Sequence, residues 1–226
     1  MNKVVVKFGG SNLRNGKDIS KILDIIIDYG NDIIVVLSAV YGLTDELNNA
    51  CLEAKYDFSS IDNNCVKISN RVLSLIINIF YKDLFKREFN KQLDLKIESL
   101  KRKLKIISKD KLIDEQVRDE ILSIGESISV DIFHFALLDR GVKNVVRYPS
   151  DIGLFTNNVN SVASINLSKS KFYVSELNNI NSTVIVPGFF GVSDDNKINL
   201  IGRGGTDYSA SAIAYCVKAK YLDFKF

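Results

Sequence analysis

Short apolar runs alternate with amphipathic stretches along most of this 226-residue chain. Residues 3–7, 33–37 and 181–187 are rich in β-branched side chains, a composition typical of strands buried in a parallel sheet. Between the first two runs, apolar side chains recur at helical spacing over residues 19–27, and this stripe ends near Gly30. The order strand, helix, strand predicts a βαβ unit at the start of the chain.

The middle of the chain has the pattern of long helices. Thr44 is positioned to cap a helix that follows the second strand. Residues 66–107 contain neither proline nor glycine, so we expect helix throughout. A second helical region is expected over residues 113–140, with one internal glycine, Gly125, where a helix would favour alanine.

Strand and turn patterns return in the last third of the chain. Residues 143–147 predict a further strand, residues 157–168 are loop-like, and residues 193–197 form a polar turn suited to a hairpin. A helix is expected after residue 207, and a final strand over residues 221–226. Because strands alternate with helices, the pattern predicts an α/β fold, a three-layer α/β/α sandwich with a largely parallel central sheet.

Composition and charge narrow the class of protein. Hydrophobic residues make up 46% and charged residues 25% of the chain, the balance of a globular protein rather than a disordered one. The net charge of +3 is too small to indicate nucleic acid as the partner. No apolar run reaches the roughly 18–20 residues of a membrane helix, and the N-terminal run is too short for a signal peptide. We therefore expect a cytoplasmic protein.

Few residues of this chain are suited to metal binding or to histidine chemistry. The three cysteines have no metal-ligand spacing, and a lone helix histidine such as His134 is usually structural. We expect any catalysis to run without a metal cage and without histidine. The one local charge excess, residues 101–105, is either the solvated face of a helix or a patch that binds a polyanion.

A glycine turn follows the first strand. Gly9 and Gly10 allow a ligand to approach the backbone because neither residue has a Cβ. The following helix offers free N–H groups and the positive end of its dipole, and Lys7 adds a positive charge. These features favour a phosphate site, and the alternative is a tight turn beside a solvated lysine.

A second glycine turn precedes the last helix. Arg203 lies between glycines, so its guanidinium is suited to bidentate capture of a carboxylate or a phosphate, and the alternative is a surface arginine. Thr206 and Asp207 either cap the helix or reach a ligand. Glu126 directly follows Gly125 and either pairs with a substrate ammonium group or is a solvated helix residue.

Together these segments resemble the catalytic domain of the aspartokinases, within the amino-acid kinase family. Residues 7–11, Lys-Phe-Gly-Gly-Ser, are similar to the family's opening Lys-Phe-Gly-Gly-Ser/Thr, and residues 35–44 are similar to its second strand and its serine–glycine–threonine loop. Residues 201–208 resemble the family's Leu-Gly-Arg-Gly-Gly-Ser-Asp-Tyr. Residues 123–126 and 188–191 give weaker support. The matches keep the family's order and imply the N-terminal part of the amino-acid kinase fold.

The resemblance implies an aspartate kinase. Such an enzyme moves the γ-phosphoryl group of ATP onto the side-chain carboxylate of L-aspartate, giving 4-phospho-L-aspartate, the first step toward lysine, threonine and methionine. Residues 1–226 would be the substrate-binding part of the kinase domain, without the nucleotide-binding half and the ACT regulatory domains. A carboxylate with a pKa of about 4 is already ionised at neutral pH, so no general base is needed. Bringing two anions together instead calls for cations and N–H donors, with Mg²⁺ carried on the nucleotide.

The resemblance also implies roles for the candidate residues. Lys7 would neutralise the transferred phosphoryl group, and Asp207 would orient Lys7 or the substrate. Arg203 would hold a carboxylate of aspartate, and Glu126 its ammonium group. The groups implied to bind the phosphates of ATP are Lys7, Gly9, Gly10, Ser11, Gly204 and Gly205. The groups implied to bind aspartate are Ser38, Thr44, Glu126, Arg203 and Thr206.

The sequence also departs from the family's pattern. Asn12 and Asp45 differ at positions peripheral to these contacts, and the chain stops at Phe226, before the nucleotide-binding half. We therefore expect weak ATP binding and little kinase activity from this chain alone, and we expect a homo-oligomer. The alternatives are acetylglutamate or uridylate kinase, a non-catalytic aspartate-binding fragment, or an unrelated α/β binding protein. Acetylglutamate has no free ammonium group for Glu126.

Overall fold

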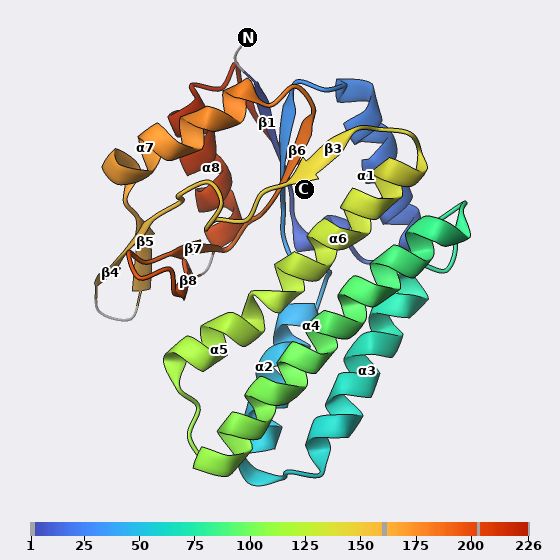
Figure 1. Ribbon diagram of the computed structural model, residues 1–226, viewed down its shortest axis with the longest axis vertical. Helices are drawn as coiled ribbons and strands as arrows, with labels where there is room; N and C mark the ends of the chain where they lie inside the picture. The colour runs from blue at the N-terminus through green and yellow to red at the C-terminus, as the bar shows by residue number, and fades with distance from the viewer. Residues whose placement is uncertain (1–2, 160–161, 203, 226) are drawn as a thin grey trace.

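The computed structural model describes residues 3–159, 162–202 and 204–225, which form an α/β core and a helical arm (Figure 1). The core contains a five-stranded sheet in the order β3-β6-β2-β1-β9, with parallel pairing throughout its described strands. These strands are β1 (Val4–Phe8), β2 (Ile33–Leu37), β3 (Asn144–Val146), β6 (Thr183–Pro187) and β9 (Leu222–Lys225). The predicted parallel sheet is confirmed.

Helices cover both faces of this sheet and give three layers (Figure 1). One face carries α1 (Gly16–Tyr29) and α6 (Ile124–Asp139), and the other carries α7 (Leu167–Ser175), the 3₁₀ turn η2 (Glu176–Asn179) and α8 (Gly205–Val217). Successive residues of a strand point to opposite faces, so Val6 packs under α1 and α6 whereas Val5 packs under α7 and α8. The three-layer α/β/α sandwich expected from the sequence is therefore confirmed.

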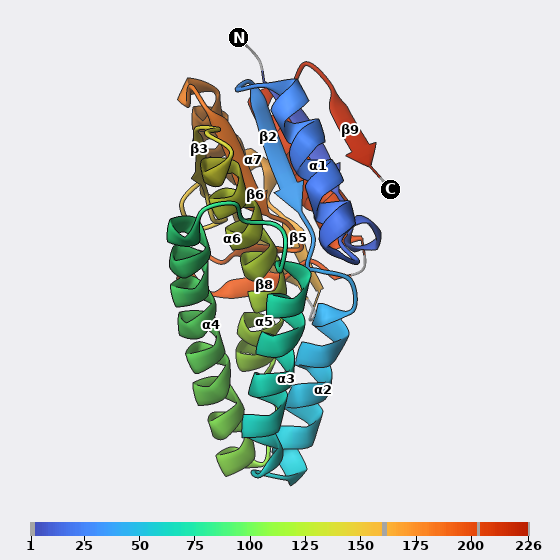
Figure 2. The same ribbon diagram turned by 90° about the vertical axis from the view of Figure 1, so that its right-hand side faces the viewer.

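A helical arm extends beyond the carboxyl ends of the strands, and Figure 2 shows β2 pointing toward it. The arm consists of α2 (Leu43–Tyr56), α3 (Ser60–Leu75), α4 (Asp83–Asp110) and α5 (Glu115–Leu122). Its buried side chains belong to the same hydrophobic cluster as the α1 face of the sheet, so arm and core share one interior. Residues 101–105 lie in α4 and are partly ion-paired, since Lys101 lies 2.7 Å from Asp62 and Lys103 pairs with Glu120.

The predicted helices are wrong in detail at two places in the arm. Residues 66–107 are not helical throughout, because the chain turns over residues 76–82 between α3 and α4. The buried Asp139 carboxylate accepts hydrogen bonds from the backbone N–H groups of Tyr81 and Lys82 and so holds this turn. A turn stabilised by a carboxylate from another helix needs neither proline nor glycine. The second helical region is interrupted at Ser123, which places Gly125 in the first turn of α6.

Of two further expectations, one needs correction and one is confirmed. Residues 157–168 are not a loop, because β4 (Thr156–Val159) and β5 (Val162–Ile165) pair as an antiparallel hairpin and α7 follows. The Asn166 side chain caps α7 by accepting a hydrogen bond from the Lys169 N–H, so polar residues that look like a loop supply a helix start. The expected hairpin around residues 193–197 is confirmed by β7 (Phe190–Val192) and β8 (Ile198–Leu200).

Helices α5 and α6 together form the most apolar helical stretch of the described chain. The stretch Glu115–Asp139 has the length and the composition of a membrane-spanning helix, yet 78% of its most apolar window is buried inside the molecule. Its apolar side chains pack against the sheet and the arm, as in the core helix of a globular domain.

Gly125 is required by the close packing of α6 on the loop after β2. A Cβ at Gly125 would lie 2.9 Å from the Cβ of Ala39, a distance that van der Waals repulsion forbids. We therefore expect Gly125→Ala to lower the free energy of unfolding by about 2 kcal/mol, although alanine is the better helix former.

Urea denaturation of a double-mutant cycle with Ala39→Gly measures this clash. The double variant should lose less stability than the two single variants added together. Strict additivity, or a stabilised Gly125→Ala variant, would show that the two Cβ positions do not meet.

Candidate active site

Lys7 lies at the carboxyl end of β1, the strand between β2 and β9. Its side chain is only 7% exposed, and its Nζ lies 2.6 Å from Oδ1 of Asp207 in α8. A Cβ at Gly9 would lie 3.0 Å from the same nitrogen, so Lys7 lies directly against the first glycine turn. The alternative interpretation of Lys7 as a solvated strand end is therefore wrong.

The two glycine turns face each other across a cavity of about 360 Å³. Gly10 begins the 3₁₀ turn η1 (Gly10–Asn12) on one side, and Gly205 begins α8 on the other. The described residues that line the cavity are Lys7, Gly9, Gly10, Ser11, Ser38, Phe189, Gly202, Gly204, Gly205, Thr206 and Asp207. Most of the residues singled out in the sequence thus come together here. Arg203, the expected carboxylate clamp, lies outside the described residues.

The start of α8 is built from backbone rather than from a capping side chain. Gly204 occupies the N-cap position with φ of 71°, and no described side chain accepts a hydrogen bond there. The alternative that Thr206 or Asp207 serves as a helix cap is therefore wrong. Instead, the Thr206 Oγ1 accepts a hydrogen bond of 2.9 Å from the Ser38 hydroxyl, which joins α8 to the end of β2.

Glu126 is buried beside the same edge of the sheet. Its residue surface is only 3% exposed, and its Oε1 accepts a hydrogen bond of 3.1 Å from the backbone N–H of Ala39. Its other oxygen, Oε2, is buried and has no hydrogen-bond partner within the described part of the chain. Burial raises the pKa of this carboxyl to about 8, against the effect of the Ala39 hydrogen bond. Glu126 is thus not a solvated helix residue.

Two of the expected aspartate ligands do not line the cavity. Neither Glu126 nor Thr44 is among the lining residues, although Glu126 accepts a hydrogen bond from Ala39, which directly follows the cavity residue Ser38. A Cβ at Gly125 would lie 3.9 Å from Oγ1 of Thr44, so Thr44 lies beside the start of α6. Thr44 is also not the cap of α2, because Gly42 occupies that position with φ of 76° and Thr44 is the second residue of the helix. The candidate site therefore has two parts, the open cavity around Lys7 and the buried carboxylate of Glu126, with the loop after β2 between them.

Two cavity residues, Phe189 and Gly202, have no role assigned from the sequence, although Gly202 belongs to the second glycine turn. Phe189 has φ of 73°, unusual for a bulky residue, and a Cβ at Gly205 would lie 3.0 Å from its ring. The likeness of residues 188–191 to a family motif is the sequence signal that points to Phe189. His134 pairs with Asn144 at 2.6 Å and does not line the cavity.

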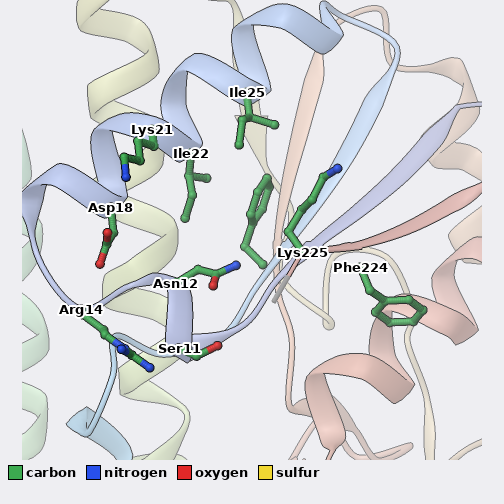
Figure 3. Close-up of a pocket in the computed structure, with 10 residues that line it drawn as sticks. Ser11, Asn12, Arg14, Asp18, Lys21, Ile22, Ile25, Phe224 and Lys225 are labelled. Carbon is green, nitrogen blue, oxygen red and sulfur yellow. The ribbon is translucent and has the colours of Figure 1, made fainter.

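A second and larger cavity lies on the α1 side of the first glycine turn (Figure 3). It has a volume of about 550 Å³, and Ser11 is the residue that it shares with the Lys7 cavity. Figure 3 shows Arg14, Asp18 and Lys21 at the end of this cavity nearest the start of α1. Its walls combine charged side chains with Phe8, Ile22 and Ile25, so it lacks the backbone-lined character of the Lys7 cavity.

Comparison with known proteins places this geometry in a family. The chain is 28% identical to the bifunctional aspartokinase/homoserine dehydrogenase of Buchnera aphidicola, over 95% of this chain and 27% of that protein. It is 38% identical over 111 residues to Aspartokinase 1 of Bacillus subtilis, which covers 49% of this chain and 27% of that protein.

Among solved structures, the fold is similar to that of Escherichia coli aspartokinase III in complex with aspartate and ADP. The TM-score is 0.82 at 22% identity, and the match covers 98% of this chain and 48% of that one. The chain thus spans between about a quarter and a half of the length of these three proteins. Residues 2–224 match the model of the amino acid kinase family. Because that match takes in nearly every residue, the chain belongs to the amino acid kinase family.

Proposed function

We propose that this chain is the substrate-binding part, residues 1–226, of an aspartate kinase. The proposed reaction transfers the γ-phosphoryl group of ATP to the side-chain carboxylate of L-aspartate and yields 4-phospho-L-aspartate. The proposal rests on two neighbouring features. Lys7 is buried between two glycine turns, and Glu126 is a buried carboxylate near them whose Oε2 has no hydrogen-bond partner among the described residues. The two curated relatives described above carry the aspartokinase name, and the E. coli structure was solved with aspartate and ADP.

The cavity around Lys7 suits the phosphoryl group. Lys7 supplies a positive charge, and the turns at Gly9–Gly10 and Gly204–Gly205 let phosphate oxygens approach the backbone. Asp207 orients the Lys7 ammonium, since the two groups are in contact before any substrate arrives. Ser11 lines the same wall and assists. Mg²⁺ would arrive on the nucleotide, since the Asp207 carboxylate is already engaged with Lys7.

Glu126 suits the ammonium group of a free amino acid. An ionised carboxylate with one buried, unpartnered oxygen is costly, and an ammonium group offsets that cost directly. Ser38, Thr44 and Thr206 supply hydroxyl groups around the same loop, and Arg203 remains the proposed clamp on a substrate carboxylate. This assignment favours aspartate over acetylglutamate, whose blocked nitrogen carries no positive charge.

The alternative is an aspartate-binding fragment without turnover. It is favoured by the cavity lining, which offers one apolar side chain, Phe189, among its described residues, and this is little surface for a purine. We further propose a cytoplasmic location, where ATP and free aspartate are available, and a homo-oligomer.

Titration calorimetry with this chain separates these possibilities. We expect L-aspartate to bind, N-acetyl-aspartate to bind about tenfold or more weakly because it lacks the ammonium group, and MgATP to bind weakly. Submicromolar MgATP binding would contradict the expected weakness and would remove the fragment alternative. Failure of aspartate to bind would overturn the proposed function.

Lys7→Ala should lower turnover of the active enzyme roughly 100- to 1000-fold, because the variant lacks the cation that stabilises the transferred phosphoryl group. The KM for aspartate should change much less, and steady-state kinetics measure both. The matched control is Lys67→Ala, which removes an exposed lysine from α3 and should leave turnover unchanged. Unchanged turnover in Lys7→Ala would remove Lys7 from its proposed role.

Glu126→Gln should weaken aspartate binding about tenfold or more while sparing MgATP. In the wild-type protein, aspartate affinity should rise with pH up to about 8, because the ammonium group is bound by the ionised carboxylate. The variant should lose this pH dependence. A selective loss of MgATP binding instead would show that the two subsites are reversed.

The same substitution tests the burial of Glu126 by thermal unfolding. A pKa raised above the unfolded value favours the protonated folded form, so wild-type stability falls as the pH rises from about 4.5 toward about 8. Glu126→Gln should therefore melt a few degrees above the wild type near pH 9 and close to it near pH 5. A difference that does not vary with pH would contradict the raised pKa.

A further inference from the structure

Arg71 of α3 reaches from the helical arm to the loop that follows β2. Its Nη1 lies 2.6 Å from Oε1 of Glu46 in α2, and its Nη2 donates a hydrogen bond to the backbone carbonyl of Tyr41. A Cβ at Gly42 would lie 3.1 Å from Nη2, so the guanidinium lies directly against this glycine. One side chain thus ties together two neighbouring helices of the arm and the loop.

This loop separates the two parts of the candidate site. Its Ala39 N–H donates to Glu126, and Ser38 just before it lines the cavity around Lys7. The loop ends at Gly42, whose left-handed conformation starts α2. A shift of the Tyr41 carbonyl would therefore move both the N–H that engages Glu126 and the start of α2.

The loop is also attached to the first glycine turn. The Tyr41 N–H donates to the Leu13 carbonyl at 3.2 Å, and the Arg14 guanidinium lies 5.2 Å from the centre of the Tyr41 ring. These contacts fix Tyr41 from the side of β1, and Arg71 fixes it from the side of the arm. Of the two attachments, the one from the arm is an ion-paired guanidinium, which holds its geometry more rigidly than a single backbone hydrogen bond.

An arginine side chain is suited to bind Glu46 and the Tyr41 carbonyl at the same time. A planar guanidinium can donate at once to a carboxylate on one element and to a carbonyl on another, in directions fixed by its geometry. A lysine ammonium at the same place would have a single charged atom and a flexible stem, so it would hold one acceptor firmly and the other loosely. The position is therefore specific for arginine in a way that a general surface ion pair is not.

We propose that Arg71 is a positioning residue for amino-acid binding, which acts by holding the loop of residues 39–42 so that Glu126 is kept in place to receive the substrate ammonium group. The inference rests on the proposed function, because it takes Glu126 as the ammonium ligand. It assigns to the helical arm a role in substrate affinity although Arg71 itself does not line the Lys7 cavity.

The test compares Arg71→Ala, Arg71→Lys and the control Arg102→Ala, which removes an exposed arginine from α4. Titration calorimetry with L-aspartate and with MgATP gives affinities, and hydrogen–deuterium exchange of residues 38–43 reports on the loop. We expect Arg71→Ala to weaken aspartate binding about tenfold and to speed exchange in the loop, with MgATP affinity changed about threefold or less. Arg71→Lys should lie between Arg71→Ala and the wild type, and Arg102→Ala should match the wild type.

The outcomes distinguish failure of this inference from failure of the proposed function. If the wild type binds aspartate and Arg71→Ala binds it equally well, the positioning role is wrong, whether or not loop exchange changes. Equal losses for aspartate and MgATP, with faster exchange throughout the arm, would show a general structural role and would also overturn it. If the wild type binds no aspartate, the proposed function fails, and the inference fails with it.

Discussion

The ion pair between Lys7 and Asp207 is the interaction on which the candidate site depends. Burying a lysine side chain to 7% exposure is unfavourable unless an opposite charge lies close by, and Asp207 provides that charge at 2.6 Å. The contact joins β1 to α8, two elements separated by almost the whole chain. It requires α8 to start at the carboxyl end of the sheet, where Gly188 lets Thr206 pack closely, since a Cβ at Gly188 would lie 2.5 Å from Cγ2 of Thr206. The cavity forms between the two glycine turns that this pairing brings together.

The strands of the sheet were predictable because runs of β-branched residues directly indicate buried strands. Residues 33–37 are buried at every position, and a run of that kind has few alternatives to a parallel strand between two helical layers. The first glycine turn was predictable as a candidate site for a related reason, since it ends a parallel strand, where open α/β sheets bind ligands. This reasoning does not place the second glycine turn, which follows β8 of the antiparallel hairpin. The break in the arm was not predictable, because it depends on Asp139 from a distant helix and leaves no local pattern.

The orientation of the Glu126 side chain also could not be predicted from the local sequence. The motif around Gly125 marked the residue as a candidate, and helical periodicity put it in a helix. Nothing local indicates that this carboxylate would face the loop after β2 rather than solvent, because that orientation depends on the packing of Gly125 against Ala39. The same holds for Arg71, an ordinary charged residue of an amphipathic helix until the fold brings it to the Tyr41 carbonyl. Tertiary contacts of single side chains therefore decide the parts of the site that the pattern of the sequence leaves open.

Lys7 and Glu126 differ in the protein groups that pair with them when no ligand is bound. Lys7 already has Asp207, whose side chain is 44% exposed, so phosphate oxygens must compete with a partner that solvent can readily stabilise once released. Glu126 has a single hydrogen bond and one buried oxygen without a described partner, and burial raises its pKa to about 8, so near neutral pH an ammonium group there replaces a proton rather than a side chain. In the proposed kinase, the amino group of the substrate would therefore displace a proton from Glu126, whereas phosphoryl oxygens would displace the half-exposed Asp207 carboxylate from Lys7. The two subsites would then respond differently to pH, because binding of the ammonium group at Glu126 releases a proton.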